Sequence, residues 1–279
     1  MAQPAISQQI KSLEEELGVF AAAPHQAQRE AHGCGRCFLV RGKGNLAHAE
    51  LSKQIARRAA RGETGSLAIG CVSASVSGFL PELIQSYRKR FPAVRVHLFE
   101  LTPEQQLQAF AREKIDVGFT RLLAASDEKN FTQERIYRDR LMLAVPETHS
   151  LAKAGQVRLE KFAAEDFVMF KRSEAPKLVD AMTQLCAKAG FTPQVVSEPP
   201  MIHTVLMAVA AGIGVAIVPG CVRRPRQLGV AFLPVRPVSP VIDLVLTRPK
   251  GEPSPTVSAW LELVRERLPA IRQQMERGV

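Results

Sequence analysis

Apolar residues near the start of the chain recur at the spacing of one face of a helix. They are Ile6, Ile10, Leu13 and Leu17. Gly18 follows directly and is typical of a helix end, while glutamates occupy positions 14–16. The first side chains of this segment are short and polar, so the predicted helix has a polar N-terminal tip. It is either an ordinary surface helix or a helix that enters a DNA groove by its tip.

Residues 20–46 show neither helical nor strand periodicity, and a helical pattern resumes only at Leu46. Leu51 and Ile55 lie on one side of this second predicted helix, with lysine and arginine around them. Turn residues at 62–65 end it. The pattern thus predicts two helices separated by an irregular segment.

From Ser66 onward, continuous apolar runs alternate with helical patterns, which predicts an α/β fold. A first unit has strands at 67–72, 94–101 and 115–119, and helices at 79–91 and 103–113. A second unit has strands at 140–146, 167–170, 194–196 and 214–219, and helices around 159–163 and at 177–189 and 201–211. A strand at 237–247 is expected to return to the first unit, and a helix at 258–274 closes the chain. We predict two Rossmann-like subdomains, 66–137 with 240–279 and 138–239, and a ligand cleft at the carboxyl ends of their strands.

The chain has 279 residues, a net charge of +10 and a pI near 9.7, and its length suits two or three domains. The positive charge suits a polyanionic partner, although solvated surface clusters explain it more simply. No apolar run approaches the roughly 18–20 residues that span a bilayer. The N-terminus lacks the features of a signal peptide. We therefore expect a cytoplasmic protein without a membrane partner.

The five cysteines are an odd number, which argues against a disulfide framework. Cys34 and Cys37 have CxxC spacing, but no second ligand pair follows in the sequence, so we interpret this pair as fortuitous. Gly212 and Gly214 end a helix instead of forming a phosphate loop. The sequence has neither metal-ligand spacing nor a nucleophile elbow. We expect no enzyme activity, no cofactor and no metal site.

Several strings of residues point to one family. QPAISQQIKSLEEELGV at the N-terminus resembles the recognition helix of LysR-type transcriptional regulators. The strings GETGSLAIG, FLPELIQSYRKRFPAVRVHLFELTPEQQLQAF, IDVGFTR, DRLMLAVPETHSLA, LCAKAGFTPQVVSE and VAAGIGVAIVP resemble the effector domain of the same family, from Gly62 to about Arg248. The resemblance implies a periplasmic-binding-protein-like effector domain behind a remnant winged helix-turn-helix at 1–19 and a linker, or dimerisation, helix at 47–62.

The resemblance also implies partners. These are promoter or operator DNA, a small-molecule effector, further copies of the chain in a homodimer or homotetramer, and RNA polymerase as a candidate. By resemblance, base edges and phosphates are contacted by Gln3, Pro4, Ser7, Gln8 and Lys11. Many relatives carry arginine where this chain has Gln8, which predicts a different contact there. Because the helix that precedes the recognition helix in the family is missing from the chain as written, we expect an N-terminal truncation that impairs DNA binding.

Residues 20–46 interrupt the place where the resemblance implies a wing and the linker helix. Translated one base later, this segment can encode TKRNVRLTAAGDVFLYEAKAIL, which supplies a basic wing strand, a turn and the start of a helix. We hypothesise two compensating frameshifts, near residues 19–20 and 46–47, in the gene or in its sequencing. The alternative is a divergent insertion. Resequencing the locus decides between them, since a coding strand that forbids the shifted translation excludes the frameshifts.

Candidate effector-binding residues stand where predicted strands end and helices begin. They are Ser73, Ser75, Thr102, Thr120, Arg121, Phe170, Met201, His203 and Thr204. Hydroxyl groups and helix N–H groups can hold an anion, and Arg121 can bind a carboxylate with two nitrogens. Helix capping explains the serines and Thr102 equally well. A surface ion pair is the alternative for Arg121, and an ordinary first-turn position is the alternative for His203.

We therefore expect a LysR-type DNA-binding regulator whose C-terminal domain binds a small anionic effector. Acids from aromatic-compound pathways are candidates, because IDVGFTR and the surroundings of Thr102 resemble the regulators that sense them. One alternative is a regulator remnant that is defective in DNA binding. Another is a stand-alone small-molecule-binding protein with the same two-lobed cleft.

Overall fold

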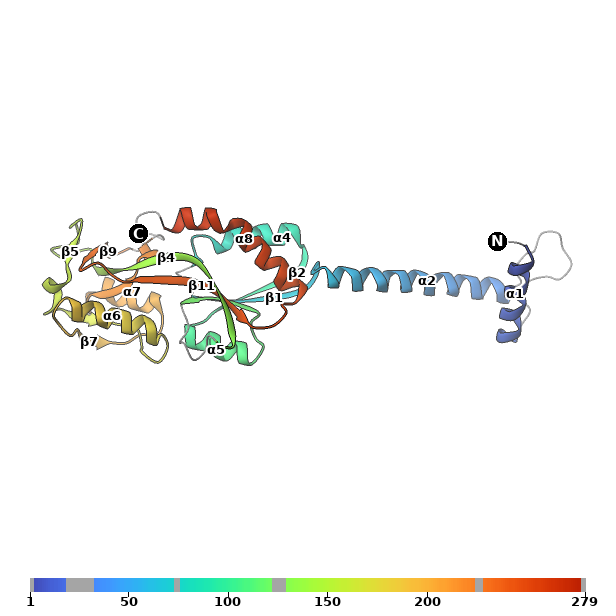
Figure 1. Ribbon diagram of the computed structural model, residues 1–279, viewed down its shortest axis with the longest axis horizontal. Coiled ribbons are helices and arrows are strands. Elements are labelled where there is room, and N and C mark those ends of the chain that lie inside the picture. Colours follow the sequence, from blue (N-terminus) through green and yellow to red (C-terminus); the bar gives the residue numbers. More distant parts are fainter. Residues whose placement is uncertain (1–2, 19–32, 73–75, 122–128, 224–227, 277–279) are drawn as a thin grey trace. The chain divides into compact units, whose positions relative to one another are not determined.

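The computed structural model describes residues 3–18, 33–72, 76–121, 129–223 and 228–276 (Figure 1). The chain divides into two compact units, Met1–Ala60 and Arg61–Val279. Among the described residues, every helix is too short or too polar to cross a bilayer.

The first unit contains two helices, α1 (Gln3–Leu17) and α2 (Gly33–Ala60). The predicted end of α1 is confirmed, because Gly18 follows it with a φ of +65°, which glycine adopts without a steric cost. Helix α2 begins at Gly33 and not at the predicted Leu46, so residues 33–46 are helical where we expected irregular chain. The other residues of that segment lie outside the described residues.

The described side chains of α2 form no buried face. From Cys37 to Ala60 its side chains are exposed, with only the position of Gly42 partly covered. Exposed apolar residues include Leu39, Leu46, Leu51 and Ile55. Residues 37–46 form a helix without the apolar periodicity that predicts one, whereas residues 46–60 have that pattern although they are exposed within this chain.

The second unit is the predicted α/β fold, and its first subdomain is built on parallel strands. These are β1 (Thr64–Cys71), β2 (Ala93–Glu100) and β3 (Val117–Arg121), with β1 in the middle. Antiparallel to β3 runs β11 (Val241–Pro249), so the predicted return of the chain to this sheet is confirmed. The prolines at 237 and 240 lie before the strand, which starts later than the pattern suggested.

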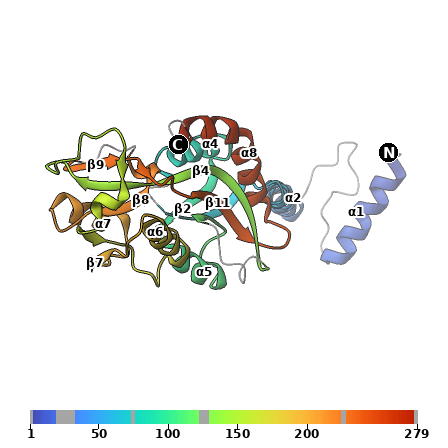
Figure 2. The same ribbon diagram turned by 60° about the vertical axis from the view of Figure 1, so that its left-hand side comes forward.

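Helices cover both faces of this sheet, with α4 (Leu80–Arg90) and α8 (Pro255–Met275) on one face and α5 (Pro103–Ala111) on the other (Figure 2). The core beneath α4 and α8 is aromatic. The rings of Tyr87 and Trp260 meet edge to face at 5.3 Å, and Tyr87 Oη donates a hydrogen bond of 3.0 Å to the carbonyl of Thr256. Trp260 is fully buried and anchors α8.

The second subdomain has shorter elements. Its strands are β5 (Val157–Arg158), β6 (Asp166–Val168), β7 (Gln194–Ser197), β8 (Ala216–Pro219), β9 (Val230–Leu233) and β10 (Val235–Arg236). Its helices are α6 (Pro176–Lys188), α7 (Ile202–Ala210) and the 3₁₀ turns η1 (Leu159–Phe162) and η2 (Gly220–Arg223). A bridge between Phe167 and Val215 connects β6 with the chain that enters β8.

One long strand, β4 (Phe131–Pro146), joins the two subdomains. Its first part pairs with β11 as far as Arg140, and its second part pairs with β8 from Leu141. The pattern predicted only the second part. A β-bulge lies opposite Leu244 and Val245 and places Ile136 and Tyr137 side by side in the core, so the alternation that identifies a strand is broken.

Candidate effector-binding pocket

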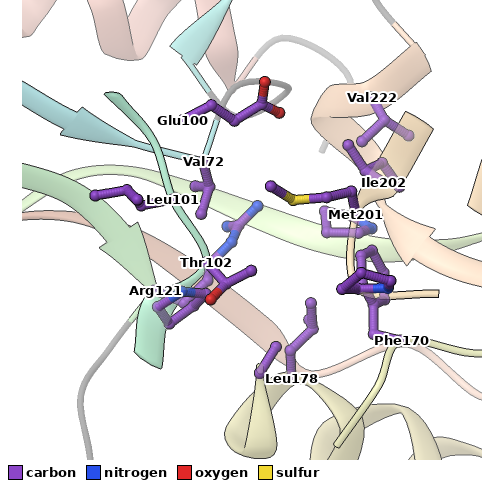
Figure 3. Close-up of a pocket in the computed structure, with 14 residues that line it drawn as sticks. Val72, Glu100, Leu101, Thr102, Arg121, Phe170, Leu178, Met201, Ile202 and Val222 are labelled. Carbon is purple, nitrogen blue, oxygen red and sulfur yellow. The ribbon is translucent and has the colours of Figure 1, made fainter. Parts of the chain in front are cut away.

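A pocket of about 570 Å³, partly open to solvent, lies between the two subdomains (Figure 3). Its walls come from the ends of β1, β2 and β3 on one side, and from the chain after β6 and the starts of α6 and α7 on the other. The lining residues are Val72, Glu100, Leu101, Thr102, Pro103, Arg121, Phe170, Ala175, Leu178, Pro200, Met201, Ile202, Pro219 and Val222. The lining is mainly apolar with a few polar groups, which is typical of small-molecule sites.

Thr102 both caps a helix and lines the pocket. Its Oγ1 accepts a hydrogen bond of 3.3 Å from the Gln105 backbone N–H. In turn, Gln105 Oε1 accepts a hydrogen bond of 3.2 Å from the Thr102 backbone N–H. This capping box gives hydrogen-bond partners to two backbone N–H groups at the N-terminus of α5. The Thr102 hydroxyl also donates a hydrogen bond of 2.7 Å to Glu174 Oε2. The capping explanation is therefore confirmed, and it leaves the residue at the pocket wall.

Arg121 reaches the pocket from the end of β3, but much of its guanidinium is already engaged within the protein. One nitrogen donates to the carbonyl of Ile242 at 3.1 Å, and the other lies 3.3 Å from Asp139 Oδ2. Both charged side chains of this ion pair are buried. Both terminal nitrogens of Arg121 thus have partners within the protein, and binding of a ligand carboxylate by two nitrogens stays a prediction. The ion pair is interior and not on the surface.

Four buried groups form a polar network beneath the pocket. Burial lowers the pKa of Arg121, but the nearby Cys221, Tyr137 and Asp139 outweigh it, so this pKa lies above its usual value. Burial also raises the pKa of Tyr137 well above its usual value. Asp139 Oδ2 accepts a further hydrogen bond of 3.2 Å from the Cys221 backbone N–H. At neutral pH the network therefore combines a charged arginine with a neutral phenol.

Phe170 and Met201 line the side of the pocket opposite Thr102 and Arg121 (Figure 3). Three other predicted residues do not line it. Thr120 is fully buried next to Arg121, and successive residues of a strand face opposite sides of the sheet. His203 and Thr204 are exposed in the first turn of α7, and His203 Nε2 lies 4.0 Å from Glu100 Oε1. A role of these three residues in effector binding stays a prediction.

The predicted Ser73 and Ser75 lie outside the described residues. Sequence reasoning missed Leu178 and Ile202, because their apolar side chains fit the helical core pattern equally well. It also missed Glu100, although this residue ends β2 just as Arg121 ends β3. Its position at the end of a strand is the signal that could have identified Glu100 from the sequence.

The predicted DNA-contacting residues all belong to α1. Gln8 and Lys11 are exposed, and Lys11 lies 4.0 Å from Glu15 one turn later. The side chains of Gln3, Pro4 and Ser7 lie outside the described residues. Cys37 is a free, exposed thiol, and the described residues contain no group of three His, Cys, Asp or Glu side chains placed to hold a metal.

The LysR substrate binding domain family matches residues 60–269. The chain belongs to the LysR family of transcriptional regulators. Its members are regulators and not enzymes. The regulator AlsR of Bacillus subtilis is 29% identical over 263 residues, which cover 94% of this chain and 86% of AlsR.

Two solved structures extend the comparison. Full-length CbnR in complex with its target DNA superposes with a TM-score of 0.77 and 25% identity, covering 96% of this chain and 91% of CbnR. BenM of Acinetobacter baylyi is 26% identical over 95% of this chain and 87% of BenM. The BenM effector-binding domain with its effector benzoate has a TM-score of 0.62 and 23% identity, covering 74% of this chain and 93% of the domain, and so supports the shared fold.

Proposed function

We propose that the pocket of the Arg61–Val279 unit binds a small carboxylic acid and that this binding modulates transcription. The observation that carries the proposal is the pocket itself, which combines apolar walls with the Thr102 hydroxyl at the N-terminus of α5. Helix N-termini favour anions, and an apolar wall suits the body of an aromatic acid. The relative BenM binds benzoate, which makes benzoate a suitable first probe.

Thermal unfolding of the full chain with and without benzoate tests this proposal, with benzamide as the uncharged counterpart. Ligand binding raises the melting temperature in proportion to ln(1 + [L]/Kd). We expect benzoate to raise it and Thr102→Val to weaken benzoate binding several-fold. A hydrogen bond to a charged group is worth roughly 1.5–3 kcal/mol, and part of that gain is offset because the Thr102 hydroxyl must first leave Glu174. Thr102→Ser keeps the hydroxyl and should restore binding.

Thr192→Val is the matched control, since Thr192 is exposed in the second subdomain and does not line the pocket. If Thr102→Val responds to benzoate as fully as the unchanged chain does, the acid binds elsewhere. If a wider set of aliphatic and aromatic carboxylates leaves the melting temperature unchanged, the proposed anionic effector is wrong.

We further propose that α1 contacts operator DNA and that α2 pairs with a second copy of the chain. Support comes from the exposed Gln8 and Lys11 on α1, and from the exposed apolar residues Leu51 and Ile55 on α2. A gel-shift assay should compare this chain with a frame-restored, N-terminally extended version. Weaker operator binding by this chain supports the hypothesis that truncation and frameshifts impair its DNA-binding region. Equal, sequence-specific binding by both contradicts it, and binding by neither favours a stand-alone small-molecule-binding protein.

A further inference from the structure

A carboxylate of the protein itself is hydrogen-bonded to Thr102, a residue of the pocket wall. Glu174 Oε2 accepts the hydrogen bond of 2.7 Å from the Thr102 hydroxyl. Thr102 begins α5 in the first subdomain, whereas Glu174 lies in the turn before α6 in the second. The bond therefore connects the two subdomains directly beside the pocket. Ala175 and Leu178, just after Glu174, are part of the pocket wall.

The Thr102 side chain has one hydrogen to donate. Its oxygen serves the Gln105 backbone N–H, and its own backbone N–H is held by the Gln105 side chain. A carboxylate outside the capping box can bind this side chain only by accepting the hydroxyl hydrogen, and the Glu174 carboxylate already accepts it. A ligand carboxylate that binds this hydroxyl must displace Glu174, because two carboxylates cannot share one hydrogen and repel each other at short range.

Glu174 is also held in place by its own turn. It is half-buried, and its backbone N–H donates a hydrogen bond of 3.0 Å to the carbonyl of Lys171. Holding the Glu174 carboxylate at Thr102 therefore costs little additional conformational entropy. A second pair crosses between the subdomains near the same strand end, where His203 Nε2 lies 4.0 Å from Glu100 Oε1.

We propose that Glu174 is an internal competitor for the anionic effector and that its hydrogen bond to Thr102 holds the two subdomains together while the pocket is empty. This inference rests on the proposed function of the pocket. Binding of an acid transfers the Thr102 hydrogen bond from Glu174 to the ligand and releases α6 from α5. Glu174 thereby sets how strongly an acid must bind before the subdomains are free to change their relative position.

Isothermal titration of benzoate and benzamide into the full chain tests the competition. Glu174→Ala removes the competing carboxylate, and Glu174→Gln removes its charge but keeps an acceptor. We expect Glu174→Ala to bind benzoate about tenfold more tightly than the unchanged chain, with Glu174→Gln in between. Benzamide affinity should change less than threefold. Glu160→Gln, an exposed change in the same subdomain, is the matched control and should bind as the unchanged chain does.

Hydrogen exchange without any ligand tests the connection between the subdomains independently. We expect Glu174→Ala to speed amide exchange in the first turns of α5 and α6, and to leave the core strand β1 protected. Unchanged exchange there overturns the inference. The inference is also overturned if the unchanged chain binds benzoate and Glu174→Ala binds it no more tightly. If no carboxylate binds any version while exchange still rises, the competitor role and the proposed function both fail, and only a structural hydrogen bond is left.

Discussion

The two units of this chain keep their secondary structure by different means. In the Arg61–Val279 unit, the strands and helices bury complete side chains such as Trp260, Phe119 and Leu67. In α2, apolar side chains such as Leu46 and Ile55 are exposed along a helix of 28 residues. The first region is determined by tertiary packing within one chain. In the second, the described side chains from Cys37 to Ala60 are unburied within the chain, and the exposed apolar ones are available for contact with a partner.

The largest expected effect comes from the packed region. Trp260→Ala removes a fully buried ring that meets Tyr87 at 5.3 Å and Phe119 at 6.4 Å. We expect the free energy of unfolding to fall by about 3–5 kcal/mol. Denaturant unfolding followed by circular dichroism measures it. Met207→Ala, at a side chain that is 67% exposed, should change it by less than about 0.5 kcal/mol. Comparable losses for both would remove the contrast between packed and exposed positions.

A smaller effect on folding, but a large one on assembly, is expected in α2. Leu51→Ser combined with Ile55→Ser removes two exposed apolar side chains from one side of the helix. Each change should alter the stability of the isolated chain by less than about 0.5 kcal/mol. If α2 pairs with a second copy, sedimentation should show a shift from dimer or tetramer to monomer. Unchanged mass would mean that this surface is not the contact, and a large loss of stability would mean that it is packed within the chain.

The smallest effect concerns cysteine chemistry. Burial, with a contribution from Glu100, raises the pKa of Cys71 to about 11, and burial raises that of Cys186 to about 11. Thiolates are the reactive form, so at pH 8 the exposed Cys37 should react with a thiol reagent first. A Cys34→Ser background leaves Cys37, Cys71, Cys186 and Cys221 to be counted. Fast reaction of Cys71 in the folded chain would show that the packed region opens.

The same pKa values give a pH dependence with a definite sign. Because folding favours the neutral thiols, their contribution to stability is complete below about pH 9 and declines as pH rises through about 11. Unfolding measured at pH 8 and pH 10.5 should show lower stability at the higher pH, and replacing Cys71 by Ala should reduce that difference.

Agreement between sequence and structure followed the way each segment is buried. The buried residues of strand β1 and of helix α7 follow the regular spacing of a strand and of a helix. Their prediction therefore needed only local information. The first part of β4 was missed because its bulge places two neighbouring residues in the core. The pocket lies at the strand ends as predicted, but its lining includes Leu178 and Ile202 and does not include Thr120.

The amino-acid sequence by itself determined the family, the α/β fold of the Arg61–Val279 unit and the edge of the sheet where the pocket lies. These follow from the periodicity of apolar residues and from short sequence motifs, which are local properties of the chain. Only the tertiary structure decided the hydrogen-bond partners of the polar residues that line the pocket. Asp139 is brought to Arg121, and Glu174 to Thr102 across 72 residues of sequence, by the packing of the two subdomains. A hydrogen-bond partner depends on which distant segments meet, and no periodic pattern records that.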